Sequence, residues 1–152
     1  MEPRFASSRP YGVSRIALVL AAAMTAASVI GLQAQQWPVL QQGMWEFTRT
    51  MQAPGGGPPR TVTSKRCTDP AADMQRQNAT LTKSGCTISA PVKKGNAYTF
   101  TAACNVMGVS SNTTSTLVVE SDSAYTLTVE GTTDGQPTKE VMKARRTGDC
   151  TK

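Results

Sequence analysis

Residues 86–104 read CTISAPVKKGNAYTFTAAC, and this stretch decides how the rest of the chain is interpreted. Apolar residues alternate with polar ones on both sides of a central KGN turn, which predicts an antiparallel β-hairpin. If Val92 lies opposite Tyr98 and Ala90 opposite Phe100, the alternating apolar residues of both strands share one face. Because a slip of one residue would divide them between two faces, we predict this register.

The same register places Cys86 directly opposite Cys104, at a Cα separation that a disulfide tolerates. Cys67 and Cys150 lie outside the hairpin, and four cysteines allow three pairings, between which sequence alone does not choose. The register favours Cys86 with Cys104, which leaves Cys67 with Cys150. Zinc sites usually contain closely spaced pairs of ligands, which are missing here, so we predict structural disulfides and no metal.

Alternating segments on both sides of this hairpin extend the pattern. Residues 44–51 place Trp45 and Phe47 on one face, and a Gly- and Pro-rich break follows them. The other predicted strands cover 60–67, 117–119, 125–129 and 138–146. The chain is therefore predicted to be all-β, a small antiparallel meander of about seven strands that forms an open curved sheet or a barrel.

One short helix is expected between the second strand and the hairpin. Asp69 followed by Pro70 is typical of an N-cap and a first helical position, and Asp73 lies in the first turn. These signals predict a helix over 71–77. It contains few apolar residues, so we expect it to lie outside the core.

Residues 1–34 have the three parts of a secretion signal. Three arginines precede an apolar run over 16–32, and Ala34 offers a small residue before the cleavage point. Cleavage at 25–27 and an uncleaved membrane anchor are the alternatives. We predict a signal peptide over 1–34 and a single disulfide-bonded β domain over 35–152, which is periplasmic or secreted and has no stable membrane insertion after cleavage.

Composition excludes several kinds of chemistry. The chain has no histidine, which removes the usual general base and the commonest metal ligand. Glu46, Glu120 and Glu130 are the remaining acid–base candidates, and alternation places each of them toward solvent. Lys and Arg number 16 against 10 Asp and Glu, but the basic residues are scattered, so nucleic acid is not an expected partner. We predict neither an enzyme nor a cofactor.

Four features together resemble the bacterial exported family called domain of unknown function 3617. They are the leader, the GMWE opening at 43–46, the spacing of the cysteines and the closing RTGDC at 146–150. The resemblance implies a disulfide-bonded β domain in the envelope and no assigned activity. The residues that match the family pattern are Gly43, Trp45, Cys67, Cys86, Cys104, Gly148 and Cys150.

A weaker likeness to small lipocalin-like barrels rests on a Gly-x-Trp in the first strand and an Arg in the last. It implies that Trp45 stacks with Arg145 or Arg146 to close one end of a barrel. The alternative is a buried tryptophan beside a solvated basic pair.

Two functions of different classes fit these expectations. The first is a non-enzymatic binding module for a small apolar ligand or a lipid, which predicts an internal cavity of several hundred cubic ångströms. Its expected lining is Trp45, Phe47, Tyr98, Phe100 and Tyr125. The alternative is a protein-interaction or inhibitor-like domain that uses exposed strand edges, or the loop at 55–57, against another envelope protein.

Overall fold

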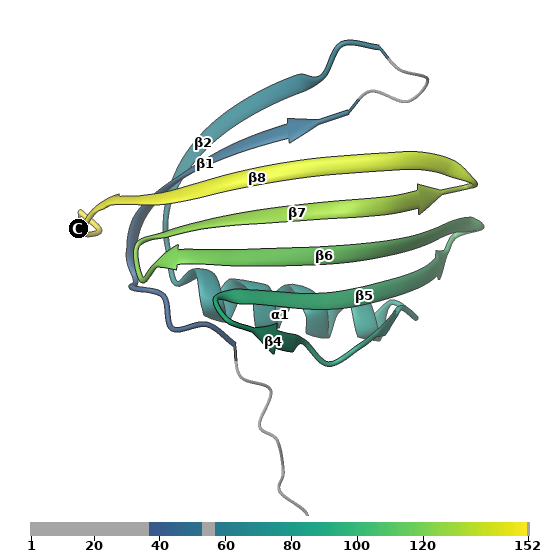
Figure 1. The fold of residues 1–152 in the computed structure, drawn as a ribbon, viewed down its shortest axis with the longest axis horizontal. Helices are drawn as coiled ribbons and strands as arrows, with labels where there is room; N and C mark the ends of the chain where they lie inside the picture. The colour runs from purple at the N-terminus through teal and green to yellow at the C-terminus, as the bar shows by residue number, and fades with distance from the viewer. Residues whose placement is uncertain (1–36, 53–56, 152) are drawn as a thin grey trace, which may run out of the picture. The chain divides into compact units, whose positions relative to one another are not determined.

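Eight antiparallel strands form one open, curved sheet in the computed structural model, which describes residues 37–52 and 57–151 (Figure 1). The strands are β1 (Gly43–Met51), β2 (Arg60–Thr68), β3 (Thr87–Ile88), β4 (Val92–Lys94), β5 (Ala97–Val106), β6 (Val109–Ser121), β7 (Ala124–Thr133) and β8 (Gln136–Gly148). Their order is β2-β1-β8-β7-β6-β5-β3, and β4 also pairs with β5. The open, curved sheet is therefore confirmed, with one strand more than expected. The predicted signal peptide, 1–34, and Gly55–Gly56 of the proposed interaction loop lie outside the described residues.

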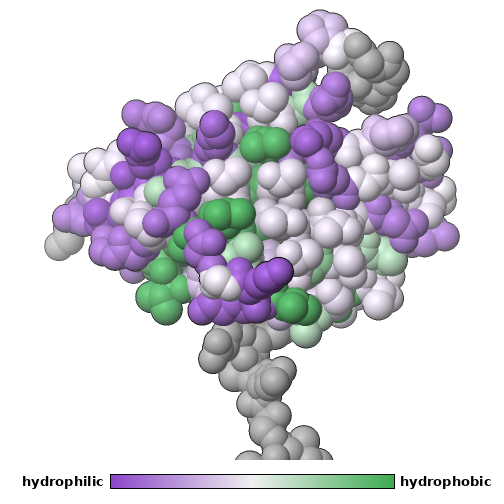
Figure 2. Space-filling model, viewed as in Figure 1, coloured by the Kyte–Doolittle hydropathy of each residue, from purple (hydrophilic) through white to green (hydrophobic). Residues whose placement is uncertain are grey.

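The core lies on the inner face of the sheet, the face that packs against the helix. Trp45 is fully buried, and its ring contacts Tyr125 at 5.6 Å and Phe47 at 6.4 Å between ring centroids. The buried cluster consists of Leu40, Trp45, Phe47, Tyr98, Leu117, Tyr125 and Ala144. On the outer face, hydroxyl pairs such as Thr48 with Thr63 link β1 to β2. Figure 2 shows a surface that is mostly pale to purple, with hydrophobic residues confined to separate patches.

Helix α1 (Pro70–Lys83) is twice as long as the predicted 71–77. Its start is as expected, because the Asp69 side chain accepts a hydrogen bond from the Ala72 N–H at 3.1 Å. The helix continues to Lys83, and the hydroxyls of Thr80 and Thr82 donate to carbonyls one turn earlier. Among the described residues, no helix has both the length and the apolar character needed to cross a bilayer.

The helix lies at the edge of the core, as expected from its composition. Its buried residue is Pro70, at the first helical position, and none of residues 71–77 belongs to the core cluster. Met74 is partly buried and packs against that cluster, so one side of the helix covers the inner face of the sheet.

Both preferred disulfides are present. Cys86 bonds to Cys104 and so joins the start of β3 to β5, with 4.2 Å between the Cα atoms. Cys67 bonds to Cys150 and ties the end of β2 to the C-terminal segment, with 5.4 Å between the Cα atoms. Structural disulfides of this kind are typical of oxidising compartments.

The predicted register of the 86–104 hairpin is correct at one end and wrong at the other. Thr87 pairs with Ala103, as the register requires, but Val92 pairs with Thr99 and Lys93 with Tyr98. The shift arises at Ala90 and Pro91, because two residues there stand against the single residue Phe100. Proline has no N–H to donate to the ladder, which makes this the natural place for an extra residue.

Candidate ligand pocket

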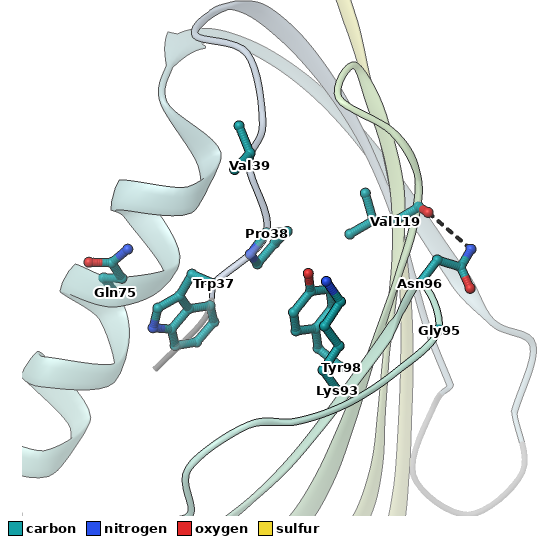
Figure 3. Close-up of a pocket in the computed structure, with 9 residues that line it drawn as sticks. All are labelled: Trp37, Pro38, Val39, Gln75, Lys93, Gly95, Asn96, Tyr98 and Val119. Carbon is teal, nitrogen blue, oxygen red and sulfur yellow. Dashed lines mark hydrogen bonds between the residues drawn. The ribbon is translucent and has the colours of Figure 1, made fainter. Parts of the chain in front are cut away.

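An open pocket of about 750 Å³ lies between α1, the segment before β1 and the β4–β5 hairpin. Figure 3 shows its walls: Trp37 and Pro38 stand between the helix and Tyr98, and Val119 lies beyond them on the sheet. The described residues that line the pocket are Trp37, Pro38, Val39, Gln75, Lys93, Gly95, Asn96, Tyr98 and Val119. Three distant parts of the chain therefore meet at one site.

The segment before β1 is held in place by the core. The Gln41 N–H donates to the Asp122 carbonyl at 2.8 Å, and the Trp45 indole N–H donates to the Gln41 carbonyl at 2.9 Å. Leu40 is buried in the core cluster. These contacts position Trp37, whose ring meets Phe100 edge-on at 5.9 Å between centroids.

The β4–β5 turn forms the floor of the pocket. Gly95 has a φ of +62°, a conformation that favours glycine. Asn96 forms two hydrogen bonds with Val119 of β6. Its side-chain amide donates to the Val119 carbonyl at 3.0 Å, and its backbone carbonyl accepts from the Val119 N–H at 2.9 Å. The turn is thus fastened to β6, and the side-chain nitrogen of Asn96 already makes a hydrogen bond within the protein.

Lys93 is the only charged residue among the described residues that line the pocket. Its ammonium lies over the Tyr98 ring, 5.4 Å from the ring centroid. A second open pocket of about 570 Å³ shares Trp37 and Gln75 with the first and continues along α1 to Thr82 and Ile88.

Of the five aromatic residues expected to line a ligand site, Tyr98 lines the 750 Å³ pocket. Trp45, Phe47 and Tyr125 lie in the core cluster, and Phe100 contacts Trp37. A ligand-lining role for these four stays a prediction. Trp37, Gln75 and Lys93 were missed. The sequence did offer a sign of Trp37, since it is an aromatic residue outside every predicted strand. For Lys93 the predicted register was misleading, because it placed the side chain on the outer face.

The expected pair of Trp45 and Arg146 lies directly opposite across β1 and β8. The Arg146 Nε–H donates to the Gln42 carbonyl at 3.0 Å, and its guanidinium also pairs with Asp149. The cation–π contacts found among the described residues join Arg66 to Phe47 and Lys93 to Tyr98 instead. Because the sheet is open, the pair does not close the end of a barrel.

The three carboxylates considered for catalysis do not converge. Glu46 pairs with Lys65 at 3.0 Å, and Glu130 pairs with Lys139 at 2.6 Å. Glu120 accepts a hydrogen bond from Thr126 at 2.8 Å. Within the described residues, no three His, Cys, Asp or Glu side chains are grouped so that they could hold a metal ion.

Asp73 links the first turn of α1 to β2. Its carboxylate accepts from the Thr68 hydroxyl and pairs with Arg76, and it lies 3.2 Å from the Arg66 guanidinium. Partial burial alone would raise the pKa of Asp73, but these hydrogen bonds and positive charges outweigh it and hold the pKa below its ordinary value. The cluster fixes the helix that forms one wall of the pocket.

Comparison with known proteins adds a family but no activity. The family model described as Protein of unknown function (DUF3617) matches residues 40–150, a range that includes α1, every strand of the sheet and all four cysteines. No curated protein and no solved structure matches the chain. The resemblance noted in the sequence is thereby confirmed, and the chain belongs to the DUF3617 family.

Proposed function

We propose that this protein is exported to the bacterial envelope and binds a small apolar ligand in the 750 Å³ pocket without transforming it. The observation that carries the proposal is the pocket itself. Its volume falls in the range of ligand sites, and its walls combine the apolar surfaces of Trp37, Tyr98 and Val119 with few polar groups. The pocket is open to solvent, so a ligand needs no large movement to enter.

The chemistry of the lining favours binding over catalysis. Its described residues include no carboxylate and no thiol, and the chain has no histidine. Glu46 and Glu130 are engaged in ion pairs away from the pocket. Among the described lining residues, Lys93 and Tyr98 are the groups that could take part in proton transfer, and neither has a carboxylate, thiol or imidazole beside it in the lining to act with it.

Export is supported by the apolar leader over 16–32 behind three arginines, together with two disulfides. The test is intact-mass analysis of the protein from the periplasmic fraction of a Gram-negative host. We expect a chain that begins near Gln35. Recovery of the chain with residues 1–34 attached to the membrane would contradict export with cleavage.

Binding is tested with the neutral fluorescent probe N-phenyl-1-naphthylamine, titrated against the purified protein. Gln75 and Gln77 are both exposed on α1, but only Gln75 lines the pocket. Gln75→Trp should fill the pocket and weaken probe binding, whereas Gln77→Trp should bind like the wild type. Absence of binding by the wild type, or equal binding by both variants, would refute the proposal.

A protein-interaction function is the second candidate, because β2 is a long edge strand. It pairs with β1 on one side, and Arg60–Cys67 are all exposed. Unpaired strand edges present backbone donors and acceptors to which an extended partner segment can add.

Two exposed valines give a matched test of this second candidate. Val62 lies on β2 and is 43% exposed, and Val109 begins β6 and is 45% exposed. If the edge binds a partner, cross-linking in periplasmic extract should yield a stoichiometric complex that Val62→Lys removes and Val109→Lys retains. A complex that survives Val62→Lys would exclude this edge.

A further inference from the structure

We infer that the ligand of the 750 Å³ pocket carries an anionic group, such as a carboxylate, phosphate or sulfonate, that binds the ammonium of Lys93. The inference rests on the proposed function and narrows it from an apolar ligand to an anionic amphiphile. It begins from the register shift in the 86–104 hairpin.

The register shift places Val92 and Lys93 of β4 on the opposite faces of the sheet from those that their hydrophobicity predicts. Continued from Thr87 and Ala103, the register would turn Val92 inward and Lys93 outward. The observed register leaves Val92 68% exposed and places Lys93 opposite Tyr98 on the inner face. Exposing a valine so that a lysine, itself still exposed, lies over Tyr98 opposes local stability, and such conflicts are expected where function requires them.

Lys93 has unused hydrogen-bonding capacity at this position. An ammonium has three donors, and the cation–π contact with the face of the Tyr98 ring attracts the charge without using a donor in a conventional hydrogen bond. Among the described residues, no carboxylate forms an ion pair with Lys93. Figure 3 shows the Lys93 side chain overlapping that of Tyr98 in this view, in keeping with the contact between its ammonium and the Tyr98 ring.

The arrangement of the walls defines the class of ligand. Trp37 and Val119 offer apolar surface, while the positive charge of the described lining lies at Lys93, beside the exposed turn at Gly95. A ligand with an apolar body and one anionic end satisfies both parts. A cationic ligand would meet an unpaired like charge.

Two fluorescent probes that differ by one sulfonate test this inference. N-phenyl-1-naphthylamine is neutral, and 1-anilinonaphthalene-8-sulfonate has the same body with an anionic group. Lys93→Met should lower the affinity for the sulfonate probe relative to that for the neutral probe roughly threefold to fivefold, as expected for loss of an exposed ion pair. Lys94→Met is the matched control, because Lys94 is exposed like Lys93 but is not among the residues that line the pocket.

Lys93→Arg, which keeps the positive charge, should bind the sulfonate probe more tightly than Lys93→Met does. Added salt to about 0.5 M should weaken binding of the sulfonate probe but not of the neutral probe. If both probes bind the wild type with equal affinity and Lys93→Met changes neither, the anionic inference is overturned while the proposed pocket stands. If neither probe binds the wild type, the proposed function itself fails.

Discussion

The Arg146 side chain occupies the space beside Gly43 in which any other residue would place its Cβ atom. A Cβ built on Gly43 would lie 2.5 Å from the Gly148 carbonyl oxygen and would also overlap the Arg146 Nε. That Nε–H donates to the Gln42 carbonyl, so the arginine is fixed against the start of β1. The glycine two residues before Trp45 is therefore explained by close packing of β1 against β8.

Gly43→Ala should lower the free energy of unfolding by about 1–3 kcal/mol, because the new methyl group has no space. Urea denaturation followed by circular dichroism measures the change. Gly43→Ala combined with Arg146→Ala should recover only part of it, since the Gly148 carbonyl stays in place. Gln42→Ala, an exposed neighbour, serves as the control, and an unchanged stability in Gly43→Ala would contradict the packing argument.

The two disulfides should differ in their contribution to stability. The bridges join cysteines 83 and 18 residues apart in sequence, and the longer loop loses more entropy in the unfolded chain. Chain-entropy arguments give about 4.5 kcal/mol for Cys67–Cys150 and about 3 kcal/mol for Cys86–Cys104. Replacing each pair of cysteines by serines and comparing the urea midpoints of the two variants tests which disulfide contributes more to stability. A larger loss for the Cys86–Cys104 pair would show that burial at Cys86 outweighs loop length.

Asp73 should make stability depend on acid pH. Its pKa in the folded protein lies below the ordinary value of 3.8, so the contribution is fully present above that value and is lost as the pH falls through the lowered pKa. Asp73→Asn should cost about 0.5–1 kcal/mol at neutral pH, because Arg66 and Arg76 are exposed and screened by solvent. It should also flatten the loss of stability below about pH 4.

Chemical denaturation between neutral pH and pH 3 measures this dependence. Asp69→Asn is the control, because asparagine keeps the N-cap hydrogen bond while it removes a neighbouring charge. A wild type and an Asp73→Asn variant with parallel pH curves would contradict the role assigned to Asp73.

Much of the sheet could be predicted because alternation is strong where one face is buried. Trp45 and Phe47 define the inner face of β1, and the predicted strands 117–119 and 125–129 lie within β6 and β7, where Leu117 pairs with Leu127. The full length of β6 was harder to predict from alternation, because Ser115 is buried among the core residues and hydroxyls therefore lie on both faces of the strand. The turn into β6 uses Met107 and Gly108, both at positive φ, and Met-Gly is not a usual turn sequence.

The pocket was beyond prediction for a different reason. Its lining depends on where α1 and the segment before β1 cross the sheet, and this is set by tertiary contacts such as that of Trp45 with the Gln41 carbonyl. Lys93 was assigned to the wrong face because the extra residue at Pro91 changes the register after the part that the cysteines fix. Local pattern determines strands, but a single bulge redirects every side chain beyond it.

Tyr125 should make stability depend on alkaline pH. Burial raises its pKa to about 12, against 10.0 for an ordinary tyrosine. The stabilisation is fully present below pH 10 and is lost as the pH rises toward about 12, because the unfolded chain then releases a proton that the folded protein retains. The loss over this range should reach about 2–3 kcal/mol. Absorbance of tyrosinate at alkaline pH, with circular dichroism on the same samples, separates titration in the folded protein from unfolding. Tyr125→Phe should reduce the decline in stability above pH 10, and a wild type in which every tyrosine ionises near pH 10 while still folded would exclude the buried environment of Tyr125.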